Sequence, residues 1–253
     1  TNVGLVSWIV NFSEPVTGLG TGNFQFATTN GLVAPPAPTS VAAGVGNSWI
    51  VSATTGTGDG TLGLNLAYFF SSIKDAAGNA FAGPAVVGEA YTVDRTAPWV
   101  ASIVRVNGAS VNTNATSVSW VVTFSERVKG LDVSNFGLSS DPAGGTTGTL
   151  ANADIEPIEN DQGTSVKVTA RNITGLGHLS LDVVTVGAVK DRALNSLACA
   201  VPMPAHTCAT NEKPFTGGEW YNIDRVNPTV ATIKRTSTNE FTNAAEAMRD
   251  IKS

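Results

Sequence analysis

Apolar and polar residues alternate with a period of two over much of the chain. The clearest runs are VSWIVNF at residues 6–12 and VSWVVTF at residues 118–124, where every second side chain is aliphatic or aromatic. Leucine-rich runs at 62–66 and 179–183 alternate in the same way. This period places one face of a strand against a core and the other face toward solvent. The pattern therefore predicts half-buried β-strands.

The same order of motifs occurs twice. Residues 6–24 match residues 118–136 at an offset of 112 (118 against 6), with Trp, Phe-Ser-Glu, Gly-Leu and Asn-Phe in register. Residues 91–98 match residues 221–228 at an offset of 130 (221 against 91), because the second copy carries two insertions. Self-similarity over the length of a domain indicates tandem modules.

The spacing of the strand-like segments indicates the type of module. They are short and are separated by Gly, Asn and Pro, and about seven fit in each copy, as in an antiparallel β-sandwich of the immunoglobulin type. We therefore expect an all-β protein with two tandem immunoglobulin-like domains, at 1–95 and 96–225, followed by a tail at 226–253. Thr1 aligns with Thr113, so the first domain lacks a counterpart of the first strand of the second.

The tail repeats the segment that the first domain lacks. The similarity runs from 226 to about 243 and then stops, because residues 247–252 read AMRDIK where a continuing repeat would read VSWVVT. We therefore interpret the tail as a spare first strand and not as the start of a third domain. Its matched positions are Pro228, Val230, Ile233 and Arg235, which repeat Pro98, Val100, Ile103 and Arg105.

A sandwich without its first strand has an open sheet edge and an uncovered part of its core. We expect a groove between the strand at 3–12 and the strand at 89–93. The residues expected to line it are Val6, Trp8, Val10, Tyr91 and Val93. The tail of a second copy fits such a groove by strand addition, and the contact is head-to-tail and open-ended. The sequence thus predicts the structural subunit of an extracellular filament or pilus, built of identical subunits, with the tail as the donor strand.

The motifs also resemble a known family. The order V-x-W-x-V-x-F-S-E, G-x-G-x-L-x-L, D-x-x-G-N and Y-x-V-D-R-x-A-P is similar to the bacterial Ig-like tandem repeats of large surface adhesins, over nearly the whole chain. The resemblance implies secreted, rod-forming domains with adhesive or structural work and no catalysis. It also leaves an alternative open, that the chain is a fragment of a long adhesin. The native polypeptide would then be far larger than 26.0 kDa.

The charge and the cysteine content limit which kinds of partner and which cellular compartment we expect. The net charge is −5 and there is no basic run, which argues against nucleic acid as a partner. No apolar run reaches the length of a membrane-spanning helix. Cys199 and Cys208 are nine residues apart, and we expect a local disulfide, with two unpaired thiols as the alternative. A disulfide favours an extracellular location.

Oxygen ligands near the predicted domain ends raise the question of calcium. Glutamates end the aromatic strands, aspartates open the D-x-x-x-N loops, and a further aspartate ends each domain. Calcium takes six to eight oxygen ligands, and a junction between domains is a place where such ligands gather. The candidate ligands are Glu14, Asp75, Asn79 and Asp94. The alternative is that these side chains cap turns and that the protein has no cofactor.

The remaining candidate chemistry is sparse. His178 and His206 have no counterparts in the first domain and lie in no nucleophile motif, so we expect the protein not to be an enzyme. Trp8 and Trp120 recur at core-facing positions. Trp99 and Trp220 do not recur, and an exposed tryptophan of this kind makes surface or matrix glycans a candidate partner.

Overall fold

A computed structural model describes residues 1–253 except 68–69, 142, 159–162, 200–206 and 235–253. The protein is all-β, as predicted, and the helical segments among these residues are three-residue 3-10 turns. In the described part of the chain no helix is long and apolar enough to cross a membrane. The immunoglobulin type stays a prediction.

Two sheets and a short ribbon form the first domain. The sheets have the strand orders β1-β5-β4 and β3-β6-β8, and the ribbon pairs β2 with β7. Leu62, Val51 and Ile73 are fully buried between them. The elements are β1 (Leu5–Asn11), β2 (Val16–Thr17), η1 (Thr21–Asn23), β3 (Phe24–Thr28), β4 (Ser40–Ala43), β5 (Ser48–Thr54), β6 (Gly60–Leu66), η2 (Phe70–Ser72), β7 (Lys74–Asp75) and β8 (Val86–Val93).

Two larger sheets form the second domain around a separate core. Their orders are β13-β15-β11-β9, with β14 also on β15, and β10-β17-β16-β12. Trp120, Leu179 and Leu181 are fully buried there. The elements are β9 (Val100–Arg105), η3 (Val106–Gly108), β10 (Asn112–Thr113), β11 (Val118–Phe124), η4 (Val133–Asn135), β12 (Phe136–Ser140), β13 (Thr147–Thr149), η5 (Asn152–Asp154), β14 (Ile155–Pro157), β15 (Ser165–Thr174), β16 (Gly177–Val183) and β17 (Trp220–Ile223).

One aromatic pair links the sheets in the same way in both domains. Trp8 meets Tyr91 edge-on with ring centroids 5.2 Å apart, and Trp120 meets Tyr221 at the same distance. Both tyrosine hydroxyls donate to a main-chain carbonyl of the tryptophan strand, that of Ser7 or Ser119. The repeated sequence therefore produces a repeated packing geometry, and one domain can serve as a template for the other.

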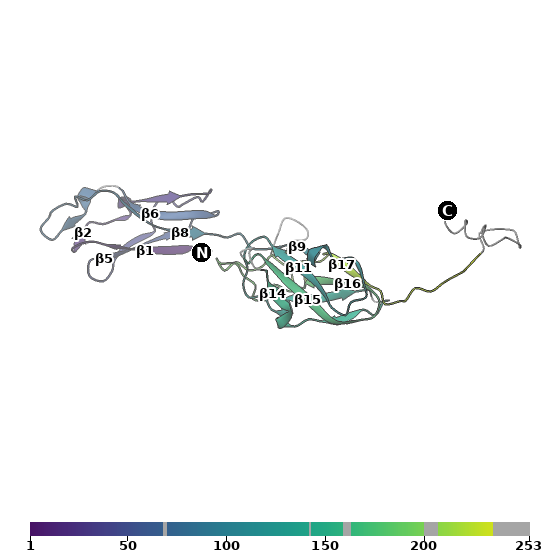
Figure 1. Ribbon diagram of the computed structural model, residues 1–253. Coiled ribbons are helices and arrows are strands. Elements are labelled where there is room, and N and C mark those ends of the chain that lie inside the picture. The colour runs from purple at the N-terminus through teal and green to yellow at the C-terminus, as the bar shows by residue number, and fades with distance from the viewer. Residues whose placement is uncertain (68–69, 142, 159–162, 200–206, 235–253) are drawn as a thin grey trace.

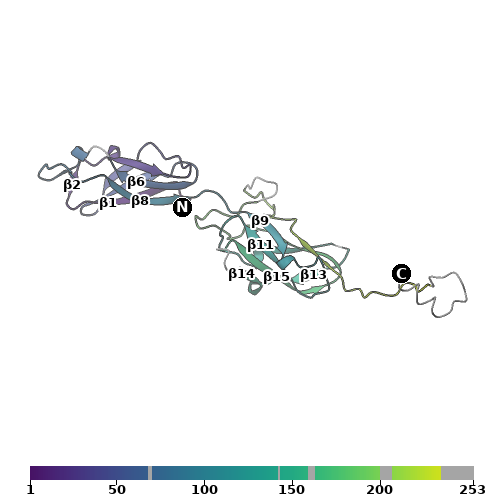
Figure 2. The same cartoon turned by 45° about the horizontal axis from the view of Figure 1, so that its top comes forward.

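The molecule is elongated, with the two domains in line (Figure 1). The ribbon of β2 and β7 lies at the end of the first domain that is far from the second domain. Residues 226–234 leave the opposite end of the molecule as an extended segment, and a second view shows the same arrangement (Figure 2). The described part of the tail, residues 226–234, therefore points away from both domains.

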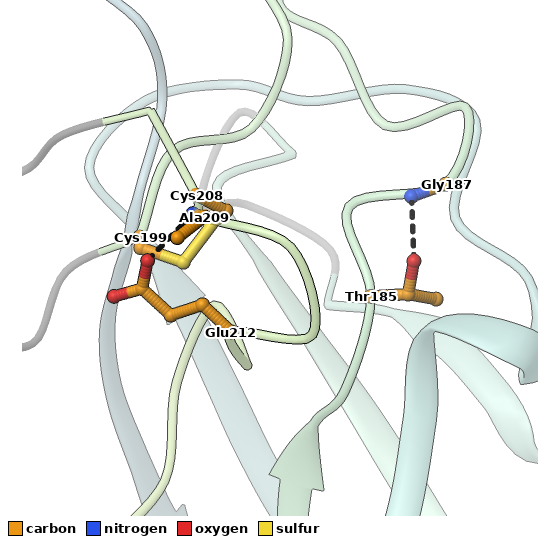
Figure 3. The surroundings of a disulfide bond; sticks show 6 residues. All are labelled: Thr185, Gly187, Cys199, Cys208, Ala209 and Glu212. Carbon is orange, nitrogen blue, oxygen red and sulfur yellow. Dashed lines mark hydrogen bonds between the residues drawn. A yellow bond between two sulfur atoms is a disulfide. The ribbon is translucent and has the colours of Figure 1, made fainter.

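The predicted disulfide joins Cys199 to Cys208 (Figure 3). It closes the loop that the second domain carries as an insertion, and residues 200–206 of that loop lie outside the described residues. Beyond the bridge, the main-chain N–H of Ala209 donates to the Glu212 carboxylate at 2.7 Å. The Cys199 side chain is fully buried, so the bridge anchors the insertion to the core of the second domain.

Candidate functional site

A groove of about 970 Å³ opens between β1 and β8 in the first domain. Its walls are the two strands, and the loop at 79–83 closes its far end. The floor is apolar and includes Phe24, Leu64 and Leu66 of the core. The sequence therefore folds into a domain whose core is reached from one side.

The groove exists because an edge of each sheet is unpaired there. Within the described residues the main chain of β1 pairs as a strand with β5 only, and that of β8 with β6 only. In the second domain the corresponding strand, β11, lies between β15 and β9. The place that β9 fills in the second domain is the groove of the first.

The contacts of β9 show what a filled groove looks like. β9 runs antiparallel to β11, with Arg105 opposite Trp120, Ile103 opposite Val122 and Val100 opposite Phe124. On its other side it reaches Glu219, whose N–H donates to the Ile103 carbonyl at 2.9 Å and whose carboxylate accepts from the Arg105 N–H at 2.7 Å. A strand in this place therefore joins both sheets.

The first domain has counterparts of the groups that surround β9 in the second domain. The indole N–H of Trp8 donates to the Glu89 carbonyl at 3.0 Å, as that of Trp120 donates to the Glu219 carbonyl at 2.8 Å. Gly88 repeats Gly218, where a Cβ atom would lie 2.6 Å from the Ile103 Cβ. Gly88 lines the groove, but a Cβ atom there would lie 2.3 Å from the Leu64 carbonyl oxygen of β6, so this glycine is also required by its own sheet.

Burial differs between the two domains where the first strand is involved. Val122 and Phe124 are 0% and 2% exposed, and Val100 and Ile103 cover them. The corresponding Val10 and Phe12 are only half-buried. The first domain therefore leaves apolar core surface in contact with water.

The expected groove residues are placed in two different ways. Trp8, Val10 and Tyr91 line the groove. Val6 and Val93 are 6% and 1% exposed and lie outside the lining. The groove extends instead past Phe12 to the loop at 79–83 and along β8 from Val86. We did not predict this half of the groove from the sequence, although residues 216–219 of the second copy align with residues 86–89, which belong to it.

The expected donor residues are exposed. Val230 and Ile233 are 77% and 91% exposed. Pro228 is exposed as well, and residues 226–234 form no strand. Arg235 lies outside the described residues. The described part of the segment therefore presents apolar side chains to solvent.

The calcium candidates separate into two sets. Asp94 lies at the junction of the domains, where its carboxylate and those of Glu126 and Asp191 offer oxygens within 4.8 Å of one another. Glu14, Asp75 and Asn79 lie together at the far end of the first domain, where all three line the groove. Carboxylates suit calcium, but each set supplies only part of the six to eight ligands that this ion takes. Calcium binding stays a prediction at both places.

Burial, hydrogen bonds and neighbouring carboxylates shift the pKa values of acidic side chains at the junction. Burial, followed by the charges of Asp94, Asp191 and Asp59, raises the pKa of Glu126 to about 7. Burial also raises the pKa of Asp94. Hydrogen bonds from Thr96 and from the Arg95 N–H lower the pKa of Asp59, which therefore remains ionised. Glu126 therefore titrates near neutral pH.

Acidification from pH 8 to pH 5 is expected to stabilise the second domain through Glu126. Its folded pKa of about 7 lies above its ordinary value of 4.5. Between these values the folded state binds more protons, so the stability contribution falls as pH rises and is lost above pH 7. Glu126→Gln should remove about 1–2 kcal/mol of this pH dependence, allowing for partial exposure. Urea unfolding across this pH range measures it.

Glu14→Gln is the matched control for this pH experiment. It makes the same change at the corresponding position of the first domain, where the side chain is exposed. An unchanged pH dependence in Glu126→Gln would contradict the assignment of the titration to Glu126.

Three tryptophans and one histidine pack against other rings of their own domain. Trp8 and Trp120 are 9% and 0% exposed. Trp220 is 43% exposed and packs against the ring of His178 at a centroid distance of 4.8 Å. His206 lies outside the described residues. Glycan binding stays a prediction.

A comparison of the chain with family models finds no match, and no curated protein matches it either.

Proposed function

We propose that the protein is the structural subunit of an extracellular filament and that the groove of the first domain receives residues 226–243 of a second copy. The observation that carries the proposal is the unpaired β1 edge beside an apolar groove. The same chain contains an exposed segment whose sequence repeats β9, the strand that fills this place in the second domain. An immunoglobulin-like first domain completed in this way is an example of strand addition.

The register of the joint follows from β9. Transferring the pairing of β9 with β11 by the two offsets sets Lys234 opposite Ile9 and Ile233 opposite Val10. Val230 then lies opposite Phe12. In this register the two apolar side chains point into the groove and Lys234 points to solvent, as Val104 does in the second domain, where it is 38% exposed.

Burial and hydrogen bonding favour the joint. Val230 and Ile233 would pass from the solvent to the environment of Val100 and Ile103, which are 1% and 2% exposed. Burying each side chain contributes roughly 1.5–3 kcal/mol. Each main-chain hydrogen bond to the open edges adds about 0.5–1.5 kcal/mol net. An extended segment is therefore the occupant that the groove stabilises best.

The polarity of the molecule supports an open-ended assembly. The segment at 226–234 leaves one end of the molecule, while β2 and the loop at 79–83 mark the other end (Figure 1). Running antiparallel to β1, a donated strand enters the groove at this other end. The donor therefore stays in line with the acceptor, and the contact surfaces differ, so the chain of subunits need not close.

Paired cysteines test the proposal. In the expected register Ile9 and Lys234 are directly opposite, where antiparallel Cα atoms lie about 4.5–5.5 Å apart, within the range for a disulfide. Protein carrying Ile9→Cys and Lys234→Cys should form a covalent ladder on a non-reducing gel after mild oxidation. The ladder should collapse to the monomer band on reduction.

Val45→Cys with Lys234→Cys is the control. Val45 is 93% exposed, so its thiol is accessible, but it lies in a loop outside the groove. This pair should give no ladder beyond trace oxidation. Equal ladders from both pairs, or none from Ile9→Cys with Lys234→Cys, would overturn the proposal.

A long tandem adhesin is the second candidate. The linker that follows the second domain has the sequence of a first strand, so in a longer polypeptide a preceding linker of the same kind would fill the groove covalently. The mass of the native chain on a denaturing gel separates the two: 26.0 kDa for the subunit and a far larger mass for the adhesin.

A further inference from the structure

Asn195 makes several hydrogen bonds at the junction between the two domains. The side-chain amide of Asn195 donates to the main-chain carbonyls of Asp94 and Thr96, at 3.0 and 3.2 Å. Its side-chain oxygen accepts from the amide of Asn2 at 3.0 Å. Asn195 thus contacts the linker and the first domain at once, and it fixes how the linker enters the second domain.

Asn195 is held by the loop that presents it. Its N–H and its side-chain amide donate to the two oxygens of the Asp191 carboxylate, both at 2.8 Å. The loop of the first domain has the same geometry, with Asn79 donating twice to Asp75 at 2.8 Å. The residue before the asparagine has a positive φ in both loops, 80° at Leu194 and 90° at Gly78. The loop therefore holds Asn79 in the same conformation as Asn195, the one in which Asn195 makes its contacts.

The counterparts of the other junction residues lie at the two free ends of the molecule. At offsets of 112, 116 and 130, the residues that form the junction correspond as follows: Asn2 to Asn114, Asp94 to Asp224, Glu14 to Glu126, Asp75 to Asp191 and Asn79 to Asn195. Each pair is identical in type. Asn114 and Asp224 belong to the end of the second domain from which the tail leaves, and the other counterparts belong to the end of the first domain where the groove opens.

Burial shows which of these surfaces is covered. Asp191 is fully buried, and Asn195 is half-buried. Asp75 is only half-buried and Asn79 is exposed. Ala198, which receives the linker by donating its N–H to the Pro98 carbonyl at 2.8 Å, is 4% exposed, whereas its counterpart Ala82 is exposed. The far end of the first domain thus has the same residues as the junction face of the second domain, but no neighbouring domain covers it among the described residues.

We propose that Asn79 of one copy binds the main-chain carbonyls of Asp224 and Val226 of a second copy, with Asn114 of that copy on its side-chain oxygen, and so sets the angle between successive subunits. This inference rests on the proposed function, because the donated strand brings the two ends together. The partner is a second copy of this chain, and the joint between subunits repeats the joint between domains.

The two joints differ in one respect. In the first domain, the Asp59 carboxylate accepts from the Arg95 N–H and from the Thr96 hydroxyl, which ties the linker to the domain before it. Leu176 and Val226 stand at the positions of Asp59 and Thr96 in the second domain. The joint between subunits therefore lacks this tie, although Arg225 still binds the segment to the second domain by donating to the carbonyls of Gly175, Ala115 and Ile173.

Angle measurements on filaments test the inference. Filaments are imaged by electron microscopy with the first domain marked by a maleimide-gold label at Val45→Cys, so that the two kinds of joint are told apart. Asn79→Ala should abolish the preferred angle between subunits and leave the angle between domains unchanged. Asn195→Ala, the matched control, should do the reverse.

Two further variants cover the case in which Asn79→Ala disturbs its own loop. Asn114→Ala removes the partner from the other side of the joint. It should also broaden the distribution of the angle between subunits. Leu176→Asp with Val226→Thr adds the hydrogen bonds that Asp59 makes in the first domain. This pair should narrow the distribution of the angle between subunits. The inference is overturned if filaments form and all three leave the angles between subunits unchanged. An unaltered protein that forms no filaments overturns the proposed function itself.

Discussion

Removing residues 226–253 is expected to abolish self-assembly while both domains remain folded. Among the described residues, 226–234 leave the second domain as an exposed extended segment, so neither core loses a contact there. The loss falls on the groove, because β9, which has the matching sequence, is already paired with β11 in the second domain. Light scattering and electron microscopy measure the assembly, and calorimetry measures the unfolding of the two domains.

Removing only residues 244–253 is the matched control. The similarity to the first strand of the second domain ends near Asn243, so this shorter deletion keeps all of the matched segment. It should polymerise like the full chain. Normal filaments from the protein that lacks 226–253 would refute strand donation by this tail.

Ile233→Ala is expected to weaken the joint between subunits by about 2–5 kcal/mol, the usual range for truncating a buried isoleucine. This corresponds to roughly a thirtyfold to several-thousandfold loss of affinity. The reason is that Ile233 repeats Ile103, which is 2% exposed and packs against Gly218. The concentration at which filaments disassemble measures the effect.

Two variants calibrate this result. Lys234→Ala changes the neighbouring residue, which should point to solvent, and it should leave assembly nearly unaltered. Ile103→Ala makes the same truncation within the second domain and should lower its free energy of unfolding by a similar 2–5 kcal/mol. An equal effect of Ile233→Ala and Lys234→Ala on assembly would contradict the register.

Much of the architecture was predictable because the chain repeats itself. Trp8 and Trp120 lie in runs with a strict period of two, and both form the same edge-on contact with a tyrosine. The two cysteines are close enough in sequence for a local bridge, and the bridge is present. These features depend on residues that are near one another in sequence or on one repeated pattern.

The details of the sites were less predictable because they depend on contacts between distant segments. Asp94 lies 32 residues from Glu126 and 97 from Asp191 in sequence (126 − 94 and 191 − 94), yet their carboxylates meet. The sequence grouped Asp94 with Glu14, Asp75 and Asn79, which lie at the other end of the first domain. Repeats reveal equivalent positions, but they do not say which copy of a position faces which neighbour.

The sequence by itself determined the all-β class, the repeat and the match between the tail and β9, because these follow from period and identity along the chain. Only the tertiary structure decided that the β1 edge is unpaired within the described residues, that the groove extends past Phe12, and that Asn195 joins the domains. Pairing of an edge and burial of a side chain are properties of neighbours in space. Their consequences for assembly therefore had to be derived from the packed domains.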